Sequence, residues 1–257
     1  MKVVLFCGGL GTRLREHSET IPKPLVEIGP RPIIWHLMRW YASYGHKEFI
    51  LCLGYRGDLI KQYFLNYDEC RSNDFRLTGG GKSRRVELFA SDIDDWSISF
   101  ADTGLHSNIG QRLRAVERYV GQDEMFLANY SDGLADLPLE RQIDEFRAAG
   151  AVAGFASVRL AMSLHAVRST EQGVVQQIES MSAADLWCNG GFFVLRREIF
   201  GYMRDGEELV EEPFHRLIAE GKLWTYRHGG FWRCMDTLKD WKMLEDLYGS
   251  GERPWER

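Results

Sequence analysis

The sequence has no apolar run near the roughly 18 residues that a transmembrane helix requires. The apolar run at residues 3–7 is also too short for the core of a signal peptide. An excess of basic residues is missing as well, because the formal net charge is −5. A nucleic-acid-binding protein usually has a basic face. We therefore expect a cytoplasmic protein that binds neither a membrane nor a nucleic acid.

Cysteine is scarce, and the motifs of several enzyme classes are absent. The five cysteines are odd in number and include no C-x-x-C pair, so we expect neither a zinc site nor a disulfide framework. No H-E-x-x-H pattern and no G-x-S-x-G nucleophile elbow occurs. Covalent catalysis therefore has no clear nucleophile. The cysteines are Cys7, Cys52, Cys70, Cys188 and Cys234.

What the chain does have is a regular alternation of short apolar runs and segments with helical periodicity. The first half alternates strictly and the second half is more mixed, which predicts an α/β fold with a mostly parallel sheet. With 257 residues and no linker or repeat, we expect a single domain over 1–257. The expected strands are 2–7, 48–53, 98–101, 125–129, 152–158, 165–169, 174–178 and 191–195, and the expected helices are 32–44, 56–65, 111–119, 139–149, 208–220 and 239–248.

Two polar stretches show no such periodicity. Residues 75–89 are rich in glycine, and we expect an irregular segment with a loop around Gly79-Gly80-Gly81. The acidic run Asp92-Ile93-Asp94-Asp95 lies among turn-forming residues. We expect it to be a solvated surface.

The first strand runs directly into a glycine-rich basic loop, Gly8-Gly9-Leu10-Gly11-Thr12-Arg13-Leu14. Such a loop at a strand end can direct backbone N–H groups at an anion, and Arg13 and Lys23 can add positive charge. A P-loop is excluded because no Lys-Ser or Lys-Thr follows Gly11. A dinucleotide fingerprint lacks its third glycine, which is replaced by Leu14. The loop therefore indicates a nucleotide or polyphosphate site, with an ordinary strand-turn-helix as the alternative.

Two carboxylates are candidates for binding the metal ion that accompanies a nucleotide. Asp132 follows an apolar strand in Tyr130-Ser131-Asp132-Gly133, and Asp236 lies in the aromatic stretch Phe231-Trp232-Arg233-Cys234-Met235-Asp236. Carboxylate oxygens are suitable Mg²⁺ ligands. Capping of a turn by Asp132 and of a helix by Asp236 are the alternatives. Together with the loop, these acids indicate direct phosphoryl or nucleotidyl transfer.

With these motifs in place, the chain resembles the sugar-phosphate nucleotidyltransferases, and within them the cytidylyltransferases that act on glucose 1-phosphate. The resemblance implies a Rossmann-like sheet, a nucleotide-binding half over about 1–150 and an acceptor-binding and oligomerisation half over about 151–257. It implies transfer of CMP from CTP to a sugar 1-phosphate, release of pyrophosphate, dependence on Mg²⁺, and a homo-oligomer. The motifs that carry it are the glycine-rich loop, Lys23-Pro24-Leu25-Val26, Asp102-Thr103-Gly104, Tyr130 to Asp136, Asn189-Gly190-Gly191 and Gly230-Phe231-Trp232…Met235-Asp236-Thr237.

The resemblance also implies roles for individual residues. Arg13 and Lys23 would be catalytic cations at the α-phosphate, and Asp132 and Asp236 would hold Mg²⁺. Asn189, Gly190 and Glu212 would face the acceptor. The implied nucleotide-binding residues are Leu5, Cys7, Gly8, Gly9, Gly11, Thr12, Arg13, Lys23, Gly110, Arg112, Ser131 and Asp132.

The chain departs from the family in one place. A lysine that contacts the sugar phosphate in the family is replaced by Ser180, in Glu179-Ser180-Met181. The acceptor should therefore differ from glucose 1-phosphate, or another cation such as Arg159 or Arg168 should bind its phosphate. A relative that uses UTP, dTTP or GTP, and a weakened nucleotide-binding regulatory protein, remain alternatives.

Overall fold

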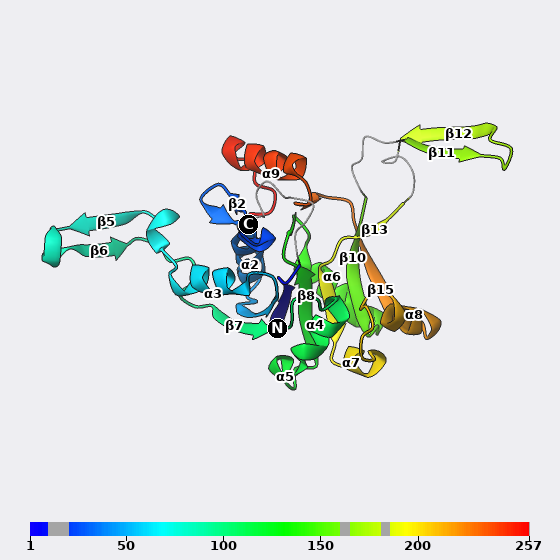
Figure 1. Ribbon diagram of the computed structural model, residues 1–257, viewed down its shortest axis with the longest axis horizontal. Helices are drawn as coiled ribbons and strands as arrows, with labels where there is room; N and C mark the ends of the chain where they lie inside the picture. The colour runs from blue at the N-terminus through cyan, green and yellow to red at the C-terminus, as the bar shows by residue number, and fades with distance from the viewer. Residues whose placement is uncertain (10–20, 160–164, 181–185, 257) are drawn as a thin grey trace.

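A computed structural model describes residues 1–9, 21–159, 165–180 and 186–256. Its centre is one mixed sheet of eight strands (Figure 1). The strands follow the order β13-β10-β14-β8-β1-β4-β7, and β15 pairs with β10. These strands are β1 (Lys2–Phe6), β4 (Glu48–Leu53), β7 (Ser97–Asp102), β8 (Met125–Tyr130), β10 (Ala153–Val158), β13 (Cys188–Asn189), β14 (Phe193–Arg196) and β15 (Leu223–His228).

The sheet is mostly parallel, as the alternation of strands and helices predicts. β1 pairs in parallel with both β4 and β8, whereas β14 is antiparallel to β8 and β10. Central strands are covered on both faces, which explains why β1 and β4 are almost continuously apolar. The parallel strands β1, β4 and β8 therefore deliver Gly8, Gly54 and Asp132 to the same edge.

Helices cover both faces of this sheet. One apolar core packs beneath α2 (Ile33–Ser43), α3 (Gly57–Leu65), α6 (Leu139–Ala149) and α9 (Leu238–Ser250). The other packs beneath α4 (Ile109–Ala115), α5 (Glu117–Val120), α7 (Ile199–Tyr202) and α8 (Glu212–Ala219). No described helix is long and apolar enough to span a bilayer. The remaining short elements are η2 (Lys23–Leu25), β2 (Glu27–Ile28), β3 (Arg31–Pro32), η3 (Glu69–Arg71), η4 (Gly81–Ser83), β9 (Gly133–Ala135) and β16 (Trp232–Cys234).

The expected strands and helices are confirmed, but several begin or end at other residues than expected. The strand expected at 191–195 starts only at Phe193, because Gly191 and Phe192 have φ angles of +78° and +50°. A strand cannot include such left-handed residues. The helix expected at 111–119 is two helices, α4 and α5, that meet at Val116.

The prediction of an irregular segment at 75–89 is wrong. This segment is a hairpin of β5 (Phe75–Thr78) and β6 (Arg85–Leu88), which projects from one end of the molecule (Figure 1). A second hairpin, β11 (His165–Ser169) with β12 (Val175–Ser180), projects at the other end. The glycines form the tip of the first hairpin, and the period-two pattern of its flanks is the signal that the glycine content obscured.

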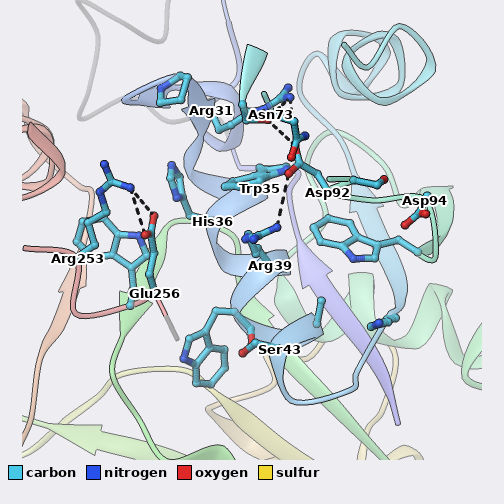
Figure 2. A pocket seen from close by; sticks show the side chains of 18 of the residues that line it. Arg31, Trp35, His36, Arg39, Ser43, Asn73, Asp92, Asp94, Arg253 and Glu256 are labelled. Carbon is cyan, nitrogen blue, oxygen red and sulfur yellow. Dashed lines mark hydrogen bonds and ion pairs between the residues drawn. The ribbon is translucent and has the colours of Figure 1, made fainter. Parts of the chain in front are cut away.

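The prediction of a solvated surface at Asp92-Ile93-Asp94-Asp95 is wrong for its first residue. The Asp92 side chain is only 4% exposed and lies 3.3 Å from the buried guanidinium of Arg31. Ser72 and Tyr67 donate hydrogen bonds to the same carboxylate oxygen at 2.5 and 2.7 Å. Figure 2 shows Arg31 and Asp92 in the wall of a cavity of about 500 Å³ beside α2. Since three donors from separate segments meet at Asp92, it holds the base of the β5–β6 hairpin to the body.

Candidate active site

Two carboxylates and one ammonium group meet at the carboxyl edge of the sheet. Lys23 Nζ lies 2.5 Å from Asp132 Oδ2 and 2.7 Å from Asp236 Oδ1. Lys23 opens the short helix η2, Asp132 follows β8, and Asp236 follows β16. The three side chains are 12%, 20% and 30% exposed, so the cluster lies at the surface of the core. The structure therefore brings Asp132 and Asp236, which are far apart in sequence, close together.

A small antiparallel ribbon brings the two acids together. We call β9, β16 and the flanking residues Asp132 and Asp236 the carboxylate ribbon. Its register pairs Gly133 with Cys234, and the Met235 N–H donates to the Asp132 carbonyl at 2.9 Å. Because these backbone contacts join the strand ends directly, the side chains of Asp132 and Asp236 project to the same place.

The electrostatics of the cluster favour a bound cation. Burial opposes the charge on Lys23, but its acidic neighbours, Asp132 first, together outweigh burial, and the pKa of Lys23 is raised overall. One ammonium therefore faces two carboxylates. Cys234 lies close enough to join the acids around one ion. Burial raises the pKa of the Cys234 thiol. A protonated thiol is a poor ligand, so the two carboxylates offer an oxygen donor set of the kind Mg²⁺ prefers.

Part of the predicted phosphate loop lies outside the described residues, namely Gly11, Thr12 and Arg13. Gly8 lies at the expected edge, directly beneath the guanidinium of Arg112, where any Cβ would be 2.0 Å from Nη1. Gly9 is exposed. The loop therefore leaves β1 where the sequence predicts, and a larger residue at Gly8 would displace Arg112.

Arg112 is only 3% exposed and is occupied by protein oxygens. Its Nη2 donates to the Gly8 carbonyl at 3.0 Å, and its Nη1 donates to Thr103 Oγ1 at 2.8 Å and to the Gly104 carbonyl at 2.9 Å. Arg112 thus ties the ends of β1 and β7 together. Arg112 therefore positions the segments around Gly8 and Gly104.

The other predicted nucleotide-binding residues pack behind the edge. Ser131 Oγ donates to the Phe6 carbonyl at 2.8 Å, which links β8 to β1. Leu5 and Cys7 have buried side chains, 0% and 1% exposed. Gly110 approaches the Glu207 carbonyl so closely that a Cβ would lie 2.2 Å from it. These residues are held in the interior by close packing and hydrogen bonding.

The predicted acceptor residues lie at a tightly held turn next to the ribbon. The Asn189 side chain accepts a hydrogen bond from the Gly191 N–H at 2.9 Å, and the Gly190 carbonyl accepts one from Trp232 Nε1 at 2.9 Å. The left-handed Phe192 is held by Asn129 Oδ1, which accepts from its N–H at 2.9 Å. Backbone strain of this kind accumulates at functional sites. Glu212 begins α8 and is exposed.

The sequence indicated Arg159 as a candidate cation but did not reveal Arg227, which lies on the far side of β10 from Asn189. Arg227 pairs in register with Ser157, and Ser157 also pairs with Asn189 from the opposite side. The guanidinium groups of Arg159 and Arg227 lie 4.9 and 5.3 Å from the centre of the Trp187 indole. Only the strand register, which joins residues distant in sequence, could have indicated Arg227.

The chain matches the family model "Nucleotidyl transferase" over residues 2–212. It is 39% identical to the glucose-1-phosphate cytidylyltransferase of Salmonella typhi, over 99% of this chain and 98% of that protein. The mannose-1-phosphate guanyltransferase of Candida albicans is 24% identical over 96% of this chain and 64% of that protein.

The fold agrees with solved structures. A UDP-glucose pyrophosphorylase from Acinetobacter baumanii superposes with a TM-score of 0.71 at 19% identity, over 99% of this chain and 95% of that one. At that identity the superposition supports the fold alone. From the family match and the full-length similarity, it follows that the chain belongs to the nucleotidyl transferase family.

Proposed function

We propose that this protein transfers CMP from CTP to a sugar 1-phosphate and releases pyrophosphate. The observation that carries the proposal is the carboxylate pair at the edge where Gly8 leaves β1, with Lys23 between its oxygens. The 39% identity to a glucose-1-phosphate cytidylyltransferase over the whole chain supports CTP as donor and glucose 1-phosphate as the first acceptor to test.

The reaction is an in-line displacement at phosphorus. An oxygen of the sugar 1-phosphate attacks the α-phosphorus of CTP and forms a new P–O bond. The bond from that phosphorus to the bridging oxygen breaks, and pyrophosphate leaves with the electron pair. No oxidant or covalent enzyme intermediate is needed, consistent with the absence of a nucleophile motif. Positioning and charge neutralisation supply most of the rate in such transfers.

The described residues have clear tasks in this chemistry. Asp132 and Asp236 would hold Mg²⁺, which when bound supplies positive charge to the phosphate oxygens. Lys23 lies within reach of the same position and stays protonated, so it can stabilise charge that develops at the α-phosphate. We assign the same task to Arg13. Arg112 and Ser131 hold the strand ends in place.

We further propose that Arg227 and Arg159 bind the acceptor phosphate in place of the missing family lysine. Ser180 ends β12, where it pairs with His165 at the base of a projecting hairpin. Arg227 instead lies in the main sheet, with β10 between it and Asn189. Arg168 lies further out on the hairpin, paired with Gln177. Arg227→Gln should raise the KM for the sugar phosphate about ten- to a hundredfold, the value of one charge-assisted contact.

A homo-oligomer is part of this proposal. The register of the β5–β6 hairpin places Phe75, Leu77, Val86 and Leu88 on one face, and these residues are 37–53% exposed. An isolated two-stranded hairpin is marginal in water, so we expect another copy to cover this face. Leu77→Lys with Val86→Lys should lower the mass measured by light scattering. An unchanged mass would contradict this assignment.

The decisive test of the function is pyrophosphate release across a matrix of donors and acceptors. CTP, UTP, dTTP and GTP are each paired with glucose 1-phosphate and with other sugar 1-phosphates, with and without Mg²⁺. We expect the fastest release with CTP and a sugar 1-phosphate, and only with Mg²⁺. A faster reaction with another nucleotide would show that this nucleotide, and not CTP, is the donor. If no pair released pyrophosphate, the protein would be a weakened nucleotide-binding protein instead of a transferase.

A further inference from the structure

The carboxylate ribbon is held to the main sheet at the end opposite the two acids. Asp136 directly follows β9, and His228 is the last residue of β15. His228 Nε2 lies 2.8 Å from Asp136 Oδ1 and 3.1 Å from the Phe231 carbonyl. Both neighbours accept hydrogen bonds, so Nε2 carries the proton and donates to them.

This contact joins a long strand pairing in the main sheet to a short one in the ribbon. β15 pairs with β10 over six residue pairs in the main sheet, whereas the ribbon is held by three pairs between β9 and β16. The His228 side chain is 6% exposed, and the Asp136 side chain is 39% exposed. The buried imidazole is therefore the fixed partner, and it fixes the ribbon through Asp136 and Phe231.

The turn between β15 and β16 is shaped around this pair. A Cβ at Gly230 would lie 2.4 Å from Asp136 Oδ1 and 2.8 Å from His228 Cε1. Only glycine fits at this position without pushing the two side chains apart. The Asp136 N–H also donates to the Phe231 carbonyl at 3.1 Å, so the same residues close this end of the ribbon.

We propose that His228 and Asp136 are positioning residues that hold the carboxylate ribbon so that Asp132 and Asp236 present their oxygens to one divalent cation. The inference rests on the proposed function only for the identity of the cation. Three residues separate Asp132 from Asp136 along β9, and the two ends of so short a ribbon move together. Partners beyond the ligands themselves typically change metal affinity or activity ten- to a hundredfold.

The test measures Mn²⁺ binding directly, with Mn²⁺ alone as the probe and the free ion followed by electron paramagnetic resonance. His228→Phe keeps an aromatic ring but cannot donate a hydrogen bond, and Asp136→Ala removes the acceptor. We expect each variant to bind Mn²⁺ about ten- to a hundredfold more weakly. The double variant should be little worse than either, because both changes break one contact. His228→Gln retains an N–H donor and should recover most of the loss.

Two controls separate positioning from damage to the fold. Asp246→Ala removes an exposed acid from a surface ion pair on α9 and should bind Mn²⁺ like the wild type. Hydrogen exchange of the Met235 and Asp136 amides should become faster in His228→Phe, while amides of β15 stay protected. Like His228→Phe, Gly230→Ala should weaken Mn²⁺ binding and speed hydrogen exchange of the Met235 and Asp136 amides.

Wild-type Mn²⁺ affinity and unchanged ribbon exchange in a folded His228→Phe protein would overturn the inference. So would an Asp136→Ala variant with normal Mn²⁺ affinity and a raised KM for the acceptor, because Asp136 would then contact substrate. If the wild type binds no Mn²⁺, the proposed metal-dependent function fails, and the exchange measurement still decides whether the pair holds the ribbon.

Discussion

Two clusters in this molecule combine buried or partly buried cations with carboxylates, and their charges balance differently. At the carboxyl edge of the sheet one ammonium, Lys23, lies between Asp132 and Asp236, which leaves an excess of negative charge close to solvent. At the base of the β5–β6 hairpin a single carboxylate, Asp92, is surrounded by Arg31, by hydroxyl donors and by Arg39 at 3.6 Å.

The difference separates a site that can accept a cation from a contact that holds segments together. A buried carboxylate oxygen that accepts from three donors gains little from a further ligand, whereas two partly exposed carboxylates that share one ammonium gain from a divalent ion. Residue type alone does not make this distinction, because both clusters contain Asp beside Lys or Arg. The number of hydrogen-bond donors around each carboxylate oxygen distinguishes the two clusters.

The comparison is tested most strongly at Asp132. Asp132→Asn should lower kcat at least a thousandfold, about 4 kcal/mol, because a ligand of the metal site is lost. Asp236→Asn should behave alike, and the double variant should be little worse than either single one. Initial rates of pyrophosphate release measure the effect. Near-normal rates in either single variant would contradict a two-carboxylate site.

The second test breaks the saturated cluster. Asp92→Asn leaves the Arg31 guanidinium, 1% exposed, without its charged partner, and should lower the free energy of unfolding by about 3–5 kcal/mol. Urea denaturation measures the loss, and kcat per folded molecule should not change. Asp95→Asn is the matched control from the same acidic run, since Asp95 pairs with Lys47 at the surface. Asp95→Asn should lower the free energy of unfolding by less than about 1 kcal/mol.

The third test asks whether Lys23 acts on the transition state. Lys23→Met should lower kcat about a hundredfold and leave CTP affinity nearly unchanged, because the cation meets charge that develops during the reaction. Single-turnover rates and calorimetric CTP binding separate the two quantities. Lost CTP affinity with a normal kcat would make Lys23 a ground-state anchor.

The smallest effect concerns His36, which faces the same cavity as the Asp92 cluster (Figure 2). Burial lowers the pKa of His36 to about 4, against 6.5 ordinarily. Between these values the unfolded chain takes up a proton that the folded chain does not, so this stability is present above pH 6.5 and lost as pH falls. The free energy of unfolding should fall by about 2 kcal/mol between pH 7 and 5 from this group.

His36→Phe should flatten that part of the stability profile. Burial and the N-terminal ammonium lower the pKa of His46 to about 4 as well, so some slope will remain. A slope that does not change between pH 7 and 5 would show that His36 is protonated in the folded state.

Much of the fold could be predicted because its signals are local. A buried strand such as β4 or β8 needs a short apolar run, and α6 needs apolar residues at helical spacing, which the chain displays over a few residues. The β5–β6 hairpin was missed because its apolar face has no partner in the described chain and its tip is rich in glycine. A glycine-rich tip weakens the alternation signal that identifies strands.

The sequence by itself determined the alternation of strands and helices, the glycine loop after β1 and the candidate carboxylates Asp132 and Asp236. Only the tertiary structure decided that Lys23 joins these acids, across 109 and 213 positions of sequence. It also decided that Arg112 and Asp92 serve internal contacts, and that Arg227 and Asn189 flank Ser157 from opposite sides in the sheet. Periodicity encodes which face of an element is buried, whereas the partner of each charge depends on how distant elements pack, and no local pattern records that.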